Sequence, residues 1–251
     1  MQVTILGSGT CVPSLRRSSP CILVKTEETK IVLDTGPGSL RQMLKAGVTV
    51  NDIDLIVYSH FHVDHTADLA PFIFASMYSP HLFRTKPLTI MGPRGLREFY
   101  RCLTLAYGKW IVPEHFVITW VEADAHLQEF ATVWLKTIPT QHSGNSIAVR
   151  IESSQGTSMA YSGDSEYCRN LVEISRHVDL LILECSFPEG MACVGHLIPS
   201  SAGKIARESQ CKKLLLTHFY PPCDEHDLIT PLRTHYHGEV LLAEDLMTVR
   251  L

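Results

Sequence analysis

The sequence predicts an α/β fold in a single domain spanning residues 1–251, and three observations support this expectation. Short runs of apolar and β-branched residues, typical of buried strands, recur in both halves of the chain. Helical stretches separate several of these runs, which is the alternation expected of a layered α/β fold. No linker or low-complexity segment interrupts the chain, and 45% of the residues are hydrophobic, enough to bury a substantial core.

The composition excludes several classes of protein. The formal net charge of −4, from 22 basic and 26 acidic residues, argues against a protein that coats nucleic acid by charge alone. No apolar run approaches the roughly 20 residues that a membrane span needs. The first ten residues lack the charged region of a signal peptide, and the eight cysteines form no C-x-x-C pair. We therefore expect reduced thiols and a cytoplasmic location.

The first half alternates strands and turns in a regular order. Residues 2–6 form an expected strand that ends in the turn Gly-Ser-Gly-Thr, and residues 21–25 and 31–33 form a hairpin. The turn Asp34-Thr35-Gly36-Pro37-Gly38 follows, and residues 40–46 form a short helix. The β-branched and apolar run at residues 53–57 is then expected to be a buried strand.

The stretch Tyr58 to Asp68, Y-S-H-F-H-V-D-H-T-A-D, directly follows that strand. It contains four groups that can bind a borderline metal ion, namely His60, His62, Asp64 and His65. A helix would turn His60 and His62 to different faces, because only positions three or four apart meet. The cluster is therefore expected in a loop at the strand's end that enters a helix near Thr66.

The region after this loop is aromatic and then basic. Residues 67–83 show a helical pattern, residues 88–91 a strand, and Gly92-Pro93 opens a helix with proline in its first turn. Arg94, Arg97 and Arg101 would share one face of that helix, and six basic residues stand against one acidic residue between positions 84 and 109. This basic stripe predicts either a track for a phosphate backbone or, more simply, a solvated face.

The second half of the sequence, like the first, contains expected strands that end in turns with polar side chains. Strands are expected at residues 132–138, 147–152, 158–161, 179–183 and 213–216, and a helix runs to about residue 208. Polar side chains follow these strands, as catalytic groups tend to do in layered α/β folds. The candidates are His142, Asp164, Glu184, His196 and His218.

The H-x-H-x-D-H pattern at residues 60–65 resembles the metallo-β-lactamase superfamily. The stretches P-L-T-I-M-G-P-R-G-L-R-E-F, from Pro87, and G-H-L-I-P-S-S-A-G-K-I-A, from Gly195, narrow the resemblance to the ribonuclease Z-like branch of tRNA 3′-processing endonucleases. The resemblance implies an αββα four-layer sandwich with two mixed β-sheets flanked by helices. Bacterial ribonuclease Z enzymes carry a long Gly/Pro-rich arm that grips tRNA, and the compact stretch from Tyr107 to Trp120 lacks it.

The resemblance also implies a set of ligands for two divalent metal ions. His60, His62 and His142 would hold one ion, Asp64, His65 and His218 the second, and Asp164 would bridge both. These nitrogen and oxygen donors favour Zn²⁺ and would also accept Mn²⁺ or iron. A hydroxide shared by the two metals would attack phosphorus, with Asp64 as base.

His196 is expected to protonate the leaving group, because it matches the histidine that does so in ribonuclease Z. Glu184 is a candidate to orient His196. Asp34 is expected either to orient a ligand histidine or to stand in a plain turn. His235 and His237 form an H-x-H pair without a neighbouring acid and are expected at the surface.

The leading functional interpretation is a dinuclear-metal phosphodiesterase of the ribonuclease Z-like branch, acting on an RNA 3′ end or a small phosphodiester. An arylsulfatase, lactonase or other ester hydrolase on the same dinuclear site is the alternative. A non-catalytic RNA-binding relative would have lost ligands, and none is lost. Relatives in this branch are commonly homodimers, and the aromatic segment 67–83 is a candidate contact surface.

Overall fold

Two seven-stranded mixed sheets form the centre of the molecule in the computed structural model, which describes residues 1–78, 83–123 and 125–251. The first sheet has the order β14-β1-β2-β3-β4-β5-β6 and the second β13-β12-β11-β10-β9-β8-β7. The strands of the first sheet are β1 (Gln2–Gly7), β2 (Cys21–Lys25), β3 (Lys30–Leu33), β4 (Leu55–Val57), β5 (Leu88–Gly92), β6 (Ile118–Glu122) and β14 (Thr248–Arg250). Those of the second are β7 (His126–Phe130), β8 (Val133–Pro139), β9 (Ile147–Ser153), β10 (Ser158–Tyr161), β11 (Leu180–Glu184), β12 (Lys213–Thr217) and β13 (Glu239–Leu242).

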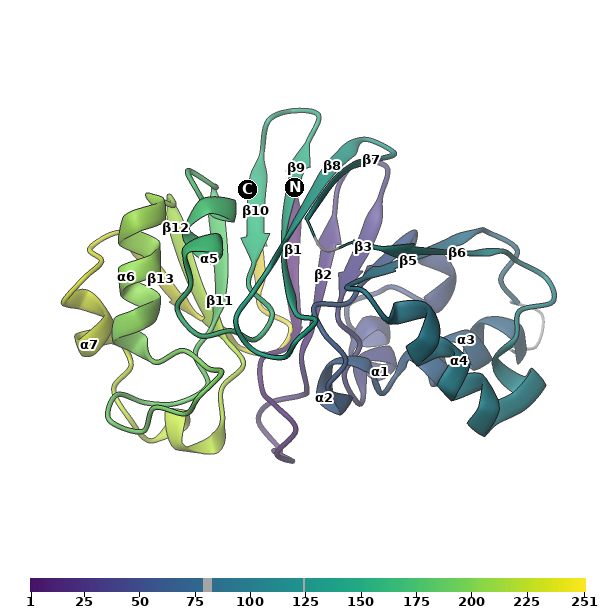
Figure 1. The fold of residues 1–251 in the computed structure, drawn as a ribbon, viewed down its shortest axis with the longest axis horizontal. Helices are drawn as coiled ribbons and strands as arrows, with labels where there is room; N and C mark the ends of the chain where they lie inside the picture. The colour runs from purple at the N-terminus through teal and green to yellow at the C-terminus, as the bar shows by residue number, and fades with distance from the viewer. Residues whose placement is uncertain (79–82, 124) are drawn as a thin grey trace.

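Helices cover the outer face of each sheet (Figure 1). The first sheet carries α1 (Ser39–Lys45), α2 (Val63–Thr66), α3 (Leu69–Tyr78) and α4 (Leu96–Tyr107). The second carries α5 (Arg169–Ile174), α6 (Pro199–Ser209) and α7 (Ile229–Arg233). This arrangement is a four-layer αββα sandwich with two mixed sheets, as predicted for the fold class.

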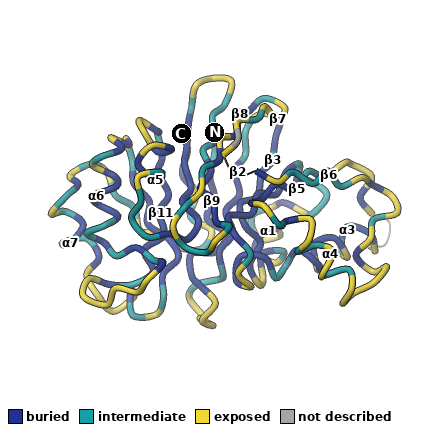
Figure 2. The backbone as a smooth tube through the Cα atoms, in the orientation of Figure 1, coloured by how far each residue is buried: buried dark blue, intermediate teal, exposed yellow. Residues whose placement is uncertain are grey.

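Side chains from both sheets share one large buried cluster. Val3, Ile5 and Leu33 of the first sheet belong to the same cluster as Leu181 and Leu215 of the second. A smaller cluster packs the outer face of the first sheet against α1, α3 and α4. Figure 2 shows the central strands as buried and the outer turns as exposed. The two sheets therefore pack against each other through one shared core.

The burial of each strand follows from its place in the sheet. In β11, every residue of the run Leu-Leu-Ile-Leu-Glu is buried, because the strand lies between the parallel strands β10 and β12 and is covered on both faces. In β8, buried and exposed residues alternate, because one face of this antiparallel strand meets water. Since β3–β6 and β10–β13 are parallel sets, the turns after their carboxyl ends gather at common edges.

The structure changes the expected start of the helix that carries the basic residues, and it shows what these residues contact. The helix begins at Leu96 with Gly95 as its N-cap, not at Gly92-Pro93, so Arg94 lies before it. Within the helix, Arg101 forms an ion pair with Glu98 at 2.7 Å, and Arg97 donates to the carbonyl of Trp120 at 2.6 Å. These contacts favour the solvated-face interpretation over a phosphate track.

Arg84 also has a structural role. Its side chain is buried and donates hydrogen bonds to the carbonyls of Val50, Ile53, Lys86 and Pro87. It therefore stabilises the loops before β4 and β5 and does not contribute to a basic surface.

Part of the expected aromatic helix lies outside the described residues. The helix α3 is described as Leu69–Tyr78, whereas positions 79–82 of the expected segment are not described. Among the described residues, no helix has the length and apolar character needed to cross a membrane.

Candidate metal centre

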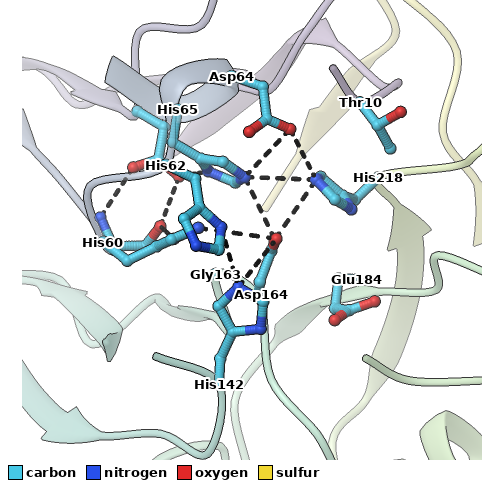
Figure 3. Close-up of polar contacts among 12 residues, drawn as sticks. Thr10, His60, His62, Asp64, His65, His142, Gly163, Asp164, Glu184 and His218 are labelled. Atoms are coloured by element: carbon cyan, nitrogen blue, oxygen red, sulfur yellow. Dashed lines mark hydrogen bonds and ion pairs between the residues drawn. The ribbon is translucent and has the colours of Figure 1, made fainter. Parts of the chain in front are cut away.

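The seven side chains predicted as ligands come together at one edge of the sandwich (Figure 3). His60 and His62 lie in the loop after β4, and Asp64 and His65 lie within α2. The remaining three each follow a strand of the second sheet, namely His142 after β8, Asp164 after β10 and His218 after β12. The two sheets therefore both contribute to a site that is spread over 159 positions of the sequence, from residue 60 to residue 218.

His60, His62, His142 and Asp164 form the first group, and one possible ligand atom of each lies within 4.8 Å of the others. His62 Nδ1 and His142 Nε2 are 3.1 Å apart. Asp164 Oδ2 lies 3.8 Å from His60 Nε2 and 3.7 Å from His142 Nε2. Nitrogen and carboxylate atoms that converge in this way are the donor set of a zinc-type site.

Asp64, His65 and His218 form the second group. The Nε2 atoms of His65 and His218 are 3.3 Å apart, and Asp64 Oδ2 lies 3.6 Å from His218 Nε2. Asp164 Oδ1 lies 3.3 Å from His65 Nε2 and 3.5 Å from His218 Nε2. Asp164 therefore turns one carboxylate oxygen to each group, which is the geometry of a bridging ligand.

Two atoms of the cluster show directly that these residues fit metal ions. His60 Nε2 and Asp164 Oδ1 are buried and have no hydrogen-bond partner among the described residues. A buried polar atom without a partner costs about 1–3 kcal/mol, and more when it is charged. A divalent cation in the first group would satisfy His60 Nε2, and one in the second group would satisfy Asp164 Oδ1.

The protonation states of His60 and Asp164 suit metal binding, whereas the charges of Asp164 and Asp34 outweigh burial and raise the pKa of His65 well above its usual range. Burial, together with the charges of His65 and His62, lowers the pKa of His60 far below its usual range. Burial alone would raise the pKa of Asp164, but the neighbouring His218 and His65 outweigh it and hold this pKa well below the usual value. The imidazole of His60 is thus neutral and the carboxylate of Asp164 ionised near neutral pH, as metal ligands must be.

Asp34 forms hydrogen bonds with one candidate ligand and with two residues next to the cluster. Its carboxylate accepts hydrogen bonds from His65 Nδ1 at 2.8 Å, from the amide and hydroxyl of Ser59, both at 2.8 Å, and from the hydroxyl of Tyr161 at 2.9 Å. The bond to His65 fixes the ring with Nε2 facing the other ligands. Of the two interpretations drawn from the sequence, the structure therefore favours the orienting role over a plain turn.

Backbone groups place two more ligands. Gly163 has φ +57°, and a Cβ atom there would lie 2.5 Å from the Cβ of Ser59, so only glycine allows the turn that presents Asp164. His142 Nδ1 donates to the carbonyl of Gly195 at 2.7 Å, which leaves its Nε2 facing His62.

A second polar cluster adjoins the second group of ligands. His196 lies three residues before α6, and its Nδ1 donates to Glu184 Oε1 at 2.9 Å. Burial lowers the pKa of His196, but the hydrogen bond and charge of Glu184 outweigh burial and raise it. Asp164, His196 and His218 also offer polar atoms within 4.8 Å of one another. His196 is therefore a candidate proton donor beside the candidate ligands, and Glu184 contacts it as expected.

Sequence reasoning missed four residues of this site: Ser59, Tyr161, Ser186 and Gly195. Ser59 and Ser186 had a usable signal, because each is a hydroxyl residue within two positions of a candidate acid or ligand at a strand's end. Tyr161 and Gly195 had none, since their partners lie 127 and 53 positions away. His235 and His237 are absent from the groups of possible ligands among the described residues.

Comparison with protein families gives one match that covers most of the chain. Residues 29–219 match the profile of a beta-lactamase superfamily domain. A probable metallo-hydrolase of Bacillus subtilis, YhfI, is 30% identical over 251 aligned positions that cover 97% of each chain. Ribonuclease Z of Methanosarcina acetivorans is 26% identical and covers 100% of this chain, with 98% of its own length aligned.

Solved structures agree with these matches. The crystal structure of YhfI superimposes with a TM-score of 0.84 at 26% identity, over 99% of this chain and 98% of the other. The short form of human tRNase Z superimposes with a TM-score of 0.79 at 24% identity, over 100% and 99% of the two chains. At that identity, the second likeness shows the fold alone.

Proposed function

The chain belongs to the beta-lactamase superfamily as a metallo-hydrolase with ribonuclease Z among its relatives, and on this premise we propose that it is a dinuclear-metal phosphodiesterase. Its substrate is an RNA 3′ end or a small phosphodiester. His60, His62 and His142 would hold one divalent ion, Asp64, His65 and His218 would hold the other, and Asp164 would contribute to both. The nitrogen and oxygen donors favour Zn²⁺.

The observation that carries the proposal is the position of His196. Its Nδ1 is engaged by Glu184 at 2.9 Å, and its ring lies parallel to that of His218 with a centroid distance of 5.9 Å. Nε2 is therefore left to give a proton to a leaving group at the metal edge. A phosphodiester with an alkoxide leaving group needs such an acid. Hydrolysis of an aryl sulfate releases a phenolate that needs no such acid, so His196 favours a substrate with an alkoxide leaving group, such as a phosphodiester, over an aryl sulfate.

The bond changes follow from these positions. Two divalent ions, when bound, lower the pKa of water towards neutrality and neutralise charge on a phosphoryl oxygen. The oxygen of the attacking water forms a bond to phosphorus in line with the leaving group, and Asp64 takes the proton of that water. The phosphorus–oxygen bond to the leaving group breaks as His196 Nε2 donates its proton to the departing oxygen.

The choice between RNA and a small diester depends on the rest of the surface. Residues 108–117 connect α4 directly to β6 through one 3₁₀ turn, Gly108–Ile111, so no arm extends from this stretch. The arginines of α4 are engaged by Glu98 and Trp120. An RNA substrate would therefore have to bind without either feature.

Hydrolysis of three substrates by Zn²⁺-loaded protein tests the function. The substrates are bis(p-nitrophenyl) phosphate, p-nitrophenyl sulfate and a precursor tRNA with a 3′ trailer, and Asp64→Ala is the blank. Cleavage of the tRNA at its 3′ end identifies an RNA-processing endonuclease, and turnover of the diester alone identifies a small-molecule phosphodiesterase. Turnover of the sulfate alone contradicts the proposal and identifies an arylsulfatase.

We also propose that the protein is a homodimer that associates through the aromatic surface formed by Phe74, Tyr78 and Trp110. These side chains are 45%, 41% and 51% exposed. Their rings contact one another, with centroid distances of 4.7 Å between Phe74 and Tyr78 and 5.7 Å between Tyr78 and Trp110. A hollow of about 530 Å³ lies beside them, lined by Phe74, Tyr107 and Trp110. Contiguous apolar surface of this kind is typical of a protein–protein contact.

A further inference from the structure

Ser186 lies where the candidate acid and a candidate metal ligand meet. It follows β11 and is fully buried. Its Oγ is 2.9 Å from His218 Nδ1, 3.0 Å from His196 Nδ1 and 2.7 Å from Glu184 Oε2. One hydroxyl group therefore contacts a side chain of the second metal site, the proposed acid and the carboxylate that holds the acid.

We propose that Ser186 is a shared positioning residue, which fixes the ring of His218 for metal binding and the ring of His196 for proton donation through the same oxygen. The metal-binding half of this inference is independent of the substrate. The half that concerns His196 rests on the proposed phosphodiesterase function.

The directions of the hydrogen bonds follow from the number of protons. A serine hydroxyl has one proton and two lone pairs. The carboxylate of Glu184 accepts only, so the hydroxyl proton goes to Glu184 Oε2, which also accepts from the amide of Ser186 at 3.0 Å. The lone pairs of Oγ are then left to accept from the two Nδ1–H groups. His196 shares its proton between Ser186 and Glu184 Oε1.

This pattern sets the tautomer of His218, whereas His196 keeps a proton on Nδ1 and, as the imidazolium, carries a second proton on Nε2. A proton on Nδ1 leaves Nε2 of His218 as a neutral donor for a metal, and that nitrogen faces Asp164 Oδ1 at 3.5 Å. The same shared oxygen holds the two imidazoles nearly parallel, at an interplanar angle of 14°. Ser186 thus orients the candidate metal ligand His218 and also holds the proposed proton donor His196 beside it.

Removal of the hydroxyl affects the two histidines differently. In Ser186→Ala, His218 Nδ1 loses the single acceptor that the described residues give it, whereas His196 keeps Glu184 Oε1. Loss of such an orienting contact typically costs 10–100-fold in metal affinity. We therefore expect a large effect on the second metal ion and a smaller, geometric effect on proton donation.

The first test is a titration of metal-free protein with Zn²⁺ in competition with a chromophoric chelator. Ser186→Ala should weaken the ion at His218 by about 10–100-fold and leave the other ion unchanged. Ser186→Thr keeps the hydroxyl and should bind both ions like the wild type. Ser76→Ala is the matched control, because the Ser76 hydroxyl is also fully buried but donates to Phe72 within α3. Wild-type affinities in Ser186→Ala, or equal losses in the alanine and threonine variants, would overturn the inference.

The second test separates action through His196 from general damage. At saturating Zn²⁺, Ser186→Ala should slow a diester with an alkyl leaving group about tenfold more than one with a nitrophenyl leaving group. In the His196→Ala background this difference should vanish, because no donor remains to be positioned. A difference of the same size in both backgrounds would overturn the catalytic half. If no diester is hydrolysed at all, the function fails, and the titration still decides the metal-binding half.

Discussion

At the scale of single residues, Asp34 shows that the candidate metal site depends on residues that hold the ligands in place. Four donors converge on one buried carboxylate, and one of them is His65 Nδ1. The residue also has φ +58°, a conformation that asparagine tolerates as well as aspartate. Asp34→Asn therefore removes acceptor capacity without adding backbone strain.

We expect Asp34→Asn to weaken Zn²⁺ binding by about 10–100-fold, because the amide nitrogen cannot accept a hydrogen bond from His65, Ser59 or Tyr161. Isothermal titration of metal-free protein measures the change. Asp179→Asn is the control, since Asp179 also accepts bonds from a serine amide and hydroxyl, but at the start of β11. Equal affinities in the two variants would show that Asp34 does not orient a ligand.

His196 gives the second prediction at this scale. His196→Ala should lower the rate on a dialkyl or RNA phosphodiester by about 10²–10⁴-fold, the usual contribution of a general acid. A nitrophenolate leaves without a proton, so the same variant should hydrolyse nitrophenyl diesters at nearly the wild-type rate. Steady-state kinetics on both classes measures the ratio, and equal losses on the two would rule out acid catalysis.

At the scale of elements, the turn from Phe187 to Ile198 links the two halves of the site. Its Gly195 carbonyl accepts from His142, and its His196 side chain reaches Glu184. Gly195 has φ +88°, and a Cβ atom there would lie 2.9 Å from His142 Nδ1. The turn thus carries the proposed acid and at the same time holds a candidate ligand of the first metal.

Gly195→Ala should lower metal affinity about tenfold, because the new methyl group displaces the His142 ring. Gly190→Ala is a close control in the same turn, since Gly190 has φ +83° but nothing within 4 Å of an added Cβ. Both variants should lose about 1–2 kcal/mol of stability from the left-handed backbone. Thermal melts and Zn²⁺ titrations measure the two effects, and a similar affinity loss in both would contradict the contact with His142.

The same elements show what the sequence can and cannot predict. Most of the ligand-bearing turns were predictable, because they follow strongly apolar strands such as β4 and β12. The start of α4 was misplaced, since Pro93 suits a first turn but Gly95 provides the φ +100° at which the helix begins. The strands β7, β13 and β14 were missed, because they are short or lie at sheet edges. Such segments become strands through their pairing with a neighbour, which the local sequence does not show. Contacts such as that between Tyr161 and Asp34 could not be predicted, because the two residues are far apart in the sequence and only the fold brings them together.

At the scale of the whole molecule, metal ions should contribute to stability as well as to chemistry. The ligands come from both sheets, and two buried atoms, His60 Nε2 and Asp164 Oδ1, have no hydrogen-bond partner among the described residues. A ligand at 100 times its dissociation constant stabilises the folded state by about 2.7 kcal/mol per site.

Zn²⁺ added to chelator-treated protein should therefore raise the midpoint of thermal unfolding by about 5–10 °C per occupied site for a chain of this size. Differential scanning calorimetry measures the shift. Asp164→Asn should respond much less, because the bridging carboxylate has lost its charge. An unchanged midpoint in the wild-type protein would mean that the cluster does not bind the ion.

The proposed dimer is the remaining property of the whole molecule. Most homodimers are closed by a twofold axis, so the surface of Phe74, Tyr78 and Trp110 would meet its own copy. Glutamate at Trp110 would then place two like charges across the axis in an apolar contact, which costs several kcal/mol. We expect light scattering to give twice the chain's mass for the wild type and the single mass for Trp110→Glu. Trp134→Glu is the control, because Trp134 is similarly exposed, at 46%, but lies on β8. A monomeric wild type would exclude the dimer, and dissociation by Trp134→Glu alone would move the contact to the second sheet.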